Sequence, residues 1–68
     1  MRLYRFLTGP DDASLCHKVT AALNGGWLLH GSPTYAYDGE ARAMRCGQAV
    51  CKEVEGVDYT ADTRLGEW

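Results

Sequence analysis

The sequence has little of what several classes of protein require. No apolar run approaches the roughly 20 residues that a membrane-spanning helix needs, so we expect no contact with a membrane. Met1-Arg2 leads directly into alternating polar and apolar residues, which predicts that there is no signal peptide. The three cysteines are odd in number and lie at unrelated spacings, so we expect reduced thiols in a cytoplasmic protein. No internal repeat or low-complexity segment is present, and the apolar fraction of 46% favours a folded domain.

Residues that bind metals or perform catalysis are present, but they form no pattern. A structural zinc site has two closely spaced pairs of ligands, such as C-x₂-C, and this chain has none, because the adjacent Cys16 and His17 point to different sides of the predicted helix. The soft ligands of the chain are Cys16, His17, His30, Cys46 and Cys51. A catalytic thiol needs a base within hydrogen-bond reach, and no histidine is predicted on the same face as Cys46. We therefore predict no metal, no cofactor and no catalytic residue, and we expect Cys51 to be the accessible thiol.

Charge is divided unevenly along the 68 residues. Residues 1–52 contain six Lys or Arg and four Asp or Glu, a net charge of +2, whereas residues 53–68 contain one Arg and five acidic residues, a net charge of −4. Residues 1–55 hold all of the expected secondary structure and are predicted to form a single domain. Residues 56–68 are polar and irregular, so we expect a mobile acidic tail, as is common for chain termini. Whether Tyr59, Leu65 or Trp68 reaches the core is left open by the sequence.

The segment from Trp27 to Lys52 predicts a β-hairpin around Asp38-Gly39, because Asp-Gly is a strong signal for a two-residue turn. This turn would pair Tyr35 with Arg42 and Leu29 with Gln48. Ser32-Pro33 interrupts the first arm. Since proline cannot donate to a ladder, we expect an edge strand or a bulge there.

Side-chain alternation divides this hairpin into two faces. The predicted core face consists of Trp27, Leu29, Tyr35, Met44, Cys46 and Val50. The other face consists of Leu28, His30, Thr34, Ala36, Ala41, Ala43, Arg45, Ala49 and Cys51. Together with Tyr4 and Phe6 from the first strand, the aromatic residues Trp27 and Tyr35 are expected to fill the core, because few other side chains are large enough.

Two further elements precede the hairpin. Residues 2–7 alternate as a strand, and residues 12–24 predict a helix with an apolar stripe of Leu15, Val19, Ala22 and Leu23. An aspartate caps its start and Gly25-Gly26 ends it. The order is β-α-β-β, and the preference for right-handed crossovers favours an α+β fold with a three-stranded antiparallel sheet of order 1-3-2 and one helix packed on one face.

Several short motifs along residues 1–55 resemble a small bacterial family known as domain of unknown function 1737. The motifs are Leu3-Tyr4-Arg5-Phe6-Leu7-Thr8-Gly9-Pro10-Asp11-Asp12, Ala22-Leu23-Asn24-Gly25-Gly26-Trp27, Gly31-Ser32-Pro33 and Gly47-Gln48-Ala49-Val50. Their order and spacing make the combination specific. The resemblance implies an uncharacterised small protein with no assigned activity, cofactor or catalytic residue.

The predicted function is protein–protein contact without catalysis, beginning with a homodimer. The candidate interface is the small apolar set Leu28, Ala36, Ala41, Ala43, Ala49 and Cys51. A three-stranded sheet also leaves two unpaired edges, and a domain this short gains from a shared core. The dimer either keeps its strands or exchanges one through hinges at residues 8–10 and 25–26. The alternative is binding of single-stranded nucleic acid by arginines and tyrosines of the sheet, and a small enzyme is the third hypothesis.

Overall fold

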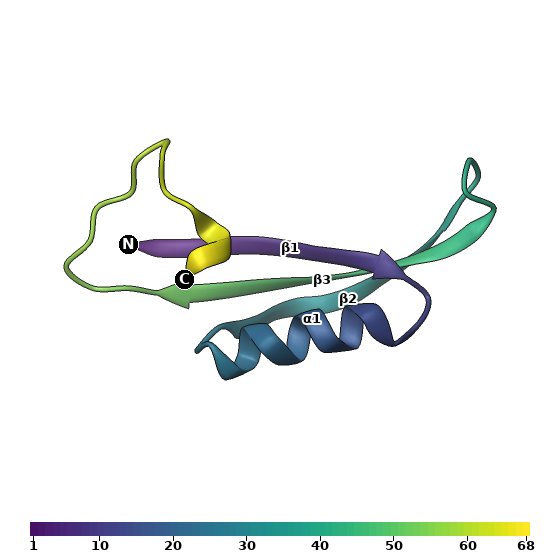
Figure 1. Cartoon of the computed structure of the whole chain (residues 1–68), viewed down its shortest axis with the longest axis horizontal. Coiled ribbons are helices and arrows are strands. Elements are labelled where there is room, and N and C mark those ends of the chain that lie inside the picture. Colours follow the sequence, from purple (N-terminus) through teal and green to yellow (C-terminus); the bar gives the residue numbers. More distant parts are fainter.

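The third strand of the chain is the central strand of the sheet. The computed structural model describes all 68 residues except the side chain of Glu67. Its elements, in chain order, are β1 (Arg2–Pro10), α1 (Ala13–Asn24), β2 (Leu28–Asp38), β3 (Ala43–Glu53) and the short 3-10 helix η1 (Leu65–Glu67). The sheet is antiparallel with the order β1-β3-β2 (Figure 1), so the predicted fold class and strand order are confirmed.

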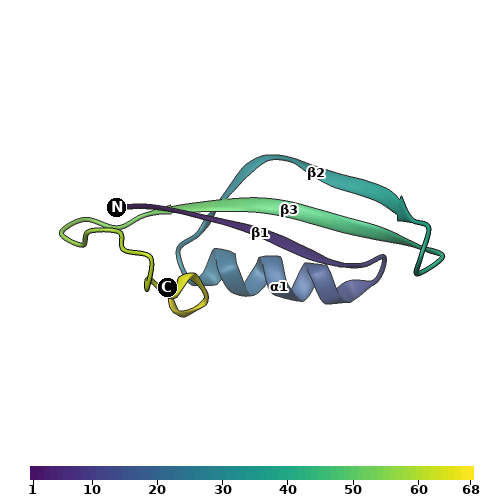
Figure 2. The same ribbon diagram turned by 90° about the horizontal axis from the view of Figure 1, so that it is seen from above.

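All helical structure lies on one side of this sheet. Figure 2 shows α1 beneath the three strands and η1 on the same side, near the carboxyl end of α1. No element of the described chain covers the opposite side, which we call the open face. None of the described helices is long and apolar enough to span a membrane.

Both ends of α1 follow from local sequence. Asp12 is the N-cap, and its carboxylate accepts a hydrogen bond of 2.7 Å from the backbone N–H of Ser14. At the other end, Gly26 takes a positive φ of 92°, and the N–H of Trp27 reaches back to the carbonyl oxygen of Ala22 at 3.0 Å. This is the Schellman arrangement, which needs a residue without a Cβ at the left-handed position. The predicted bounds of the helix are confirmed.

The core lies between α1 and the middle of the sheet. Five side chains are buried there: Leu3, Leu7, Ala22, Trp27 and Val50. Leu15 and Val19 of α1 pack against them. The predicted stripe is wrong at its last member, because Leu23 is turned from the sheet and is 42% exposed. The sheet therefore contacts a narrow stripe of small and medium side chains.

The prediction of a core built from four aromatic residues is wrong in three cases. Trp27 is 2% exposed, but Tyr4, Phe6 and Tyr35 are 54%, 50% and 59% exposed. Tyr4 and Phe6 alternate with Leu3 and Leu7 along β1, so they lie on the open face. One helix covers only one side of a strand that is apolar on both sides.

The turn of the hairpin also differs from the prediction. Residues 39–42 form a four-residue loop, in which the Asp38 carboxylate accepts from the N–H groups of Glu40 and Ala41 at 3.1 and 3.2 Å. Arg42 completes the loop with a φ of 53°. Side-chain capping by Asp38 thus replaces the tight Asp-Gly turn.

The longer loop shifts the register. Tyr35 pairs with Cys46, four residues beyond the predicted Arg42, and Leu29 pairs with Val50, two beyond the predicted Gln48. Both shifts are even, so every strand residue keeps its predicted face. Ala41, which was assigned to a strand, lies in the loop.

Part of the predicted core face extends beyond the helix. α1 has 12 residues and spans roughly 18 Å, whereas β2 and β3 have 11 residues each and span roughly 36 Å. Met44 and Cys46 toward the loop end of the hairpin are only partly buried, whereas Leu29, which pairs with buried Val50, is 56% exposed because it lies on the edge strand β2. The far end of the hairpin projects from the body as a two-stranded arm (Figure 1).

The predicted irregularity at Ser32-Pro33 is confirmed as a bulge in edge strand β2. His30 pairs with Ala49 and Thr34 with Gly47, so three residues of β2 face Gln48 alone. The buried amide of Gln48 donates to the carbonyl oxygens of His30, Gly31 and Ala49 at 3.4, 3.2 and 2.9 Å. One side chain thereby satisfies carbonyls that the bulge removes from the ladder.

Residues 54–68 return along the helix side of the sheet. Leu65 packs against the core, and the backbone oxygen of Trp68 accepts a hydrogen bond of 2.6 Å from Lys52 Nζ. Tyr59 is 66% exposed and Trp68 is 37% exposed. Of the three tail residues whose contact with the core the sequence left open, Leu65 is therefore the one that contacts it. The mobility of the tail stays a prediction.

Candidate interaction surface on the open sheet face

The open face combines large side chains at its edge strands with small ones at its centre. Tyr4 and Phe6 lie on β1, and Leu28, 71% exposed, lies on β2. The central strand contributes Ala43, Arg45, Gly47, Ala49, Cys51 and Glu53 to this face. Between the charged residues Arg45 and Glu53, the central strand therefore carries only the small residues Gly47, Ala49 and Cys51 on this face.

Phe6 lies across the central strand at Gly47. A Cβ added to Gly47 would approach Phe6 Cζ to 2.4 Å and Thr34 Oγ1 to 2.8 Å. Only glycine leaves room for the ring at this point, and the ring in turn covers the exposed backbone of the glycine. The glycine at position 47 thereby determines how the Phe6 ring lies on the open face.

The structure brings five of the six predicted interface residues to the open face. Leu28 pairs with Cys51 across the sheet, and Ala36 lies beside Arg45, near Ala43. Ala49 and Cys51 are partly covered by the neighbouring strands. Ala41 lies apart from them, in the loop at the tip of the arm.

Tyr4 and Phe6 are the members of this surface that the sequence analysis missed. The signal was present in β1, where Leu3 and Leu7 alternate with two aromatic residues. Such a strand has two apolar faces, and a chain with a single helix covers one of them. The aromatic pair was assigned to the core because of its size, although the aliphatic pair occupies it.

The open face carries little net charge. Arg45 forms an ion pair of 3.9 Å with Asp38 on the same side of the hairpin. At the opposite end Arg2 of β1 pairs in register with Glu53 of β3, so a second opposite pair lies side by side. A surface that is apolar and nearly neutral favours contact with protein over contact with a polyanion.

The two edges of the sheet differ. β2 is interrupted by its bulge, where Gly31 has a φ of 72° and Pro33 has no N–H to offer. β1 runs for nine residues without a bulge and meets proline only at its last residue. Irregular edges discourage pairing with another strand, so β1 is the edge that is suited to it.

A polar cluster lies beneath the root of the arm, at the start of α1. The Tyr35 hydroxyl donates to one oxygen of Asp11, and Cys46 Sγ lies 3.9 Å from the other. The hydrogen bond to Asp11 raises the pKa of Tyr35, because it favours the protonated phenol. Partial burial, followed by the charge of Asp11, raises the pKa of the Cys46 thiol. A thiol with a raised pKa is a poor nucleophile near neutral pH. We therefore interpret the cluster as a contact that positions the arm, and not as a catalytic site.

The other potential ligands do not converge. Among the described residues no three of His, Cys, Asp or Glu are grouped to hold a metal ion. Cys16 is exposed on α1, whereas Cys46 and Cys51 are partly buried on opposite faces of β3. The expectation that Cys51 is the accessible thiol is therefore wrong, because its neighbours on the open face cover it in part.

Comparison with known proteins assigns the chain to a family. A family model with the description Domain of unknown function (DUF1737) matches residues 1–53. The chain belongs to this family. The match confirms the resemblance found in the sequence, and it ends at the last residue of β3, so the DUF1737 region comprises the sheet and α1. No curated protein and no solved structure matches the chain.

Proposed function

We propose that this DUF1737 protein is a non-enzymatic domain that acts through protein–protein contact, first by forming a homodimer through its open face. The observation that carries the proposal is its exposed area. A compact monomer of 7.5 kDa is expected to expose about 4200 Å² of surface, whereas this chain exposes 5009 Å². The excess of about 800 Å² is close to the area that one partner contributes to a standard interface.

The shape of the molecule agrees with this excess. Its radius of gyration is 13.5 Å, whereas about 11 Å is expected for a compact chain of this length. Its principal extents are 44, 24 and 19 Å, because the arm projects and the sheet has one uncovered side. A second copy packed on the open face would provide the missing layer, since sheets are ordinarily stabilised by burying an apolar face.

The side chains of the open face suit a second copy. The central strand offers the small side chains of Ala49 and Cys51, which allow close approach, and Tyr4 and Phe6 offer large contact area. Tyrosine and phenylalanine are enriched in the buried centres of interfaces, where charged residues are depleted. The cytoplasmic location stays a prediction from the cysteine pattern.

Light scattering after size-exclusion chromatography tests the dimer. We expect twice the chain mass of 7.5 kDa at micromolar concentration. Leu28→Glu and Ala43→Glu should each yield a folded monomer, because they place a charge in the proposed interface. Thr20→Glu is the matched control, since Thr20 lies exposed on α1, on the other side of the sheet.

A wild-type chain that stays monomeric and folded at all concentrations would refute the homodimer. A dimer that persists in both Leu28→Glu and Ala43→Glu would place the interface elsewhere, with the edge of β1 as the next surface to test. Exchange of a strand between the two copies is separable from simple packing, because swapped subunits exchange only as fast as the monomer opens.

Single-stranded nucleic acid is the second candidate ligand of this face. The observation in its favour is that Tyr4 and Phe6 stand exposed on a sheet, where bases could stack on them. The low net charge of the open face argues against binding of nucleic acid, because Arg45 and Arg2 each lie beside an acidic residue. A gel shift with single-stranded RNA at low salt tests it, and binding that weakens as salt rises would replace the protein–protein proposal.

A further inference from the structure

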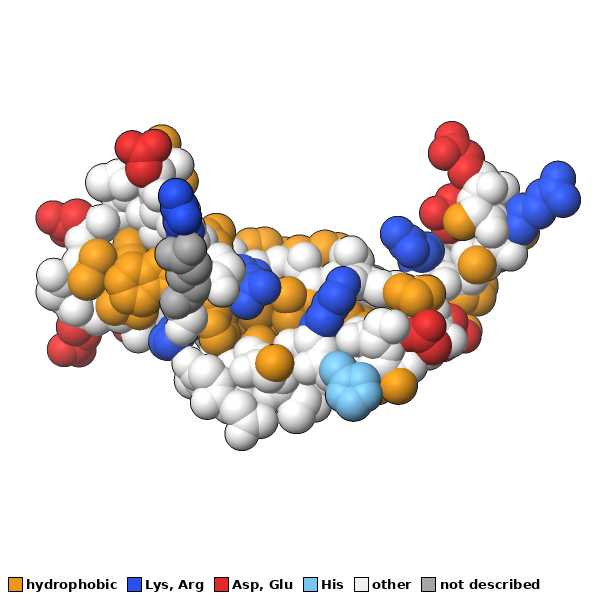
Figure 3. Space-filling view, in the orientation of Figure 1, with side chains coloured by type: hydrophobic (Ala, Val, Ile, Leu, Met, Phe, Trp, Pro, Cys, Tyr) orange, Lys and Arg blue, Asp and Glu red, His pale blue; other side chains and the backbone are white. Residues whose placement is uncertain are grey.

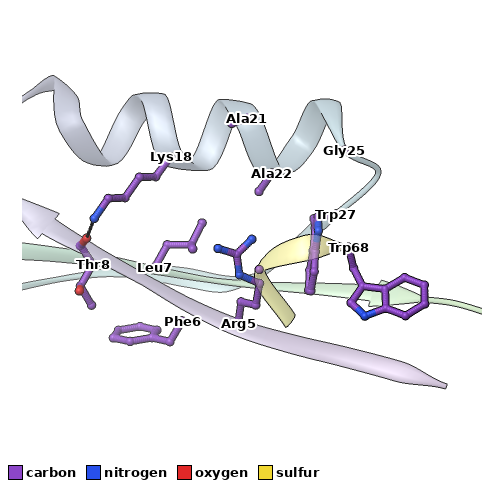
Figure 4. A pocket seen from close by; sticks show the side chains of 11 residues that line it. Arg5, Phe6, Leu7, Thr8, Lys18, Ala21, Ala22, Gly25, Trp27 and Trp68 are labelled. Atoms are coloured by element: carbon purple, nitrogen blue, oxygen red, sulfur yellow. Dashed lines mark hydrogen bonds between the residues drawn. The ribbon is translucent and has the colours of Figure 1, made fainter. Parts of the chain in front are cut away.

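A groove of about 550 Å³ lies on the helix side of the sheet, between β1 and α1. Figure 4 shows Arg5, Leu7 and Thr8 of β1 along one wall and Lys18, Ala21 and Ala22 of α1 along the other. The indoles of Trp27 and Trp68 lie at one end. The volume falls within the range of ligand sites, and the walls combine apolar side chains with two cations.

Neither cation of the groove is paired with a carboxylate among the described side chains. The Arg5 guanidinium lies 5.4 Å from the centre of the Trp27 ring. Lys18 Nζ donates to the carbonyl oxygen of Thr8 at 2.8 Å. Just outside the groove, Lys52 Nζ donates to the carbonyl oxygen of Gly25 at 2.7 Å and to a backbone oxygen of Trp68 at 2.6 Å.

A groove lined by cations without carboxylate partners is unusual in an acidic chain, and the net charge of this chain is −2. Figure 3 shows basic side chains across the middle of this side of the molecule, whereas toward its two ends acidic side chains lie together with further basic ones. The positive potential is therefore concentrated along the groove, where it favours an anionic partner.

The groove runs along the free edge of β1. Met1 exchanges both of its backbone hydrogen bonds with Val54, at 2.6 and 2.7 Å, so the odd-numbered residues of β1 face β3 in an antiparallel ladder. The N–H and C=O groups of the even-numbered residues therefore point away from the sheet. Those of Tyr4 and Phe6 have no backbone partner in the described chain, and the carbonyl of Thr8 is the one that Lys18 holds.

We propose that this groove binds an extended acidic segment of a partner protein, which adds a strand to the free edge of β1 and places carboxylates against Arg5 and Lys18. Side chains alternate along a strand, so every second residue of the added segment would face the groove. Asp or Glu at those alternate positions would replace the Thr8 carbonyl at Lys18 with a charged acceptor, which makes the stronger hydrogen bond.

An extended segment fits better than a compact anion for two reasons. The cations are distributed on both walls along the groove and do not converge on one point. The free backbone N–H and C=O groups of β1 beside them are also arranged at the spacing of a strand, which another strand matches and a compact anion does not.

The probe is a short fluorescent peptide that alternates glutamate and threonine, added to the full chain and followed by fluorescence anisotropy at low salt. We expect saturable binding that weakens as salt rises, and no binding of the peptide in which lysine replaces glutamate. Methylation of alternate backbone nitrogens keeps the charge but removes the donors, so it should abolish most of the binding. Equal binding of the methylated peptide would overturn the addition of a strand.

Substitutions on the two walls test the groove itself. Lys18→Gln should weaken binding about two- to fivefold, as expected for an exposed charge pair, and Arg5→Gln about tenfold, because Arg5 is half-buried. Arg45→Gln is the matched control, since it removes a charge from the open face and should leave binding unchanged. Lys18 is exposed, so its variant keeps the test valid even if Arg5→Gln unfolds the chain.

Absence of saturation at low salt would overturn the proposal, as would equal weakening by Lys18→Gln and Arg45→Gln, which would indicate attraction without a site. The inference does not rest on the homodimer, because the groove and the open face lie on opposite sides of the sheet. A chain that is monomeric by light scattering but binds the peptide through Lys18 would refute the dimer and support the groove.

Discussion

The two faces of the sheet contain apolar residues from the same strand, but only one of them is a core. On the covered face Leu3 and Leu7 are 1% and 7% exposed, whereas Tyr4 and Phe6 on the open face are 54% and 50% exposed. Size and hydrophobicity do not explain this difference, because the larger side chains are outside. Position relative to α1 explains it, and α1 lies where the connection from β1 to β2 takes it.

The two faces also differ in what their residues contribute, because one face stabilises the fold and the other is available to a partner. A residue of the covered face contributes to folding through burial within one chain. A residue of the open face contributes little until a partner covers it. Substitutions on the two faces should therefore affect different measurements, and the following four predictions are ordered by the size of their expected effect on stability.

The largest effect is expected for Trp27→Ala on the covered face. Trp27 is 2% exposed, and truncation of a buried Trp costs about 3–5 kcal/mol. A domain of this length has a total stability of about 3–10 kcal/mol, so the urea unfolding transition should move far toward zero denaturant or vanish. Tyr4→Ala on the open face is the control and should cost about 0.5 kcal/mol or less in the monomer. Equal losses in the two variants would show that the faces do not differ in this way.

The next effect is expected for Gln48→Leu, which keeps the volume but removes the donor beneath the bulge. The carbonyls of His30 and Gly31 would lose their partner, at a cost of about 1–3 kcal/mol. Amide hydrogen exchange should accelerate in β2 more than in β1. Thr34→Val is the control, because its hydroxyl makes only a long contact of 3.4 Å with the Gly47 carbonyl. Uniform exchange across the sheet would mean that the Gln48 amide does not hold the bulge.

A smaller effect is expected for Gly47→Ala on the open face. The new Cβ would displace chiefly the half-exposed Phe6 ring and, to a smaller extent, the Thr34 hydroxyl, so the cost is about 1 kcal/mol. In a Phe6→Ala background most of this cost should disappear, which a double-mutant cycle measures. Gly39→Ala is the control, because a Cβ there meets nothing within 4 Å. Additive effects of the two substitutions would contradict the contact between Phe6 and Gly47.

The smallest effect is expected for Asp12→Ala at the start of the covering helix. The hydrogen bond from Ser14 lowers the pKa of Asp12 below its ordinary value of 3.8. The carboxylate therefore stabilises the fold fully above that value, and its contribution is lost as the pH falls through the lowered pKa. The difference in thermal midpoint between wild type and Asp12→Ala should be constant at neutral pH and shrink in strong acid. Asp12→Asn keeps the cap without the charge, so the difference in thermal midpoint between Asp12→Asn and Asp12→Ala should not change with pH.

Local chemistry made much of the fold predictable. The cap at Asp12, the glycines after α1, the proline in β2 and the alternation of β3 each act within a few residues, and each prediction from them is confirmed. The turn at Asp38-Gly39 was predicted wrongly because an Asp-Gly pair is compatible both with a two-residue turn and with a four-residue loop. The Asp38 carboxylate decides between them by accepting from Glu40 and Ala41.

The candidate surfaces were less predictable. Five of the six proposed interface residues lie together on the open face, because an even register shift preserves side-chain alternation. Tyr4 and Phe6 were missed, since alternation shows which residues share a face but not which face a helix will cover. The groove was missed as well, because Arg5 and Lys18 are 13 positions apart and belong to different elements.

By itself, the sequence determined the order of the elements, the ends of the helix, the place of the bulge and the two sets of side chains along each strand. These depend on backbone sterics and on hydrogen bonds between near neighbours. Only the tertiary structure decided which set became the core, how far a helix of 12 residues reaches over strands of 11, and where unpaired cations meet a free strand edge. Those outcomes depend on distances between elements, which no local pattern contains.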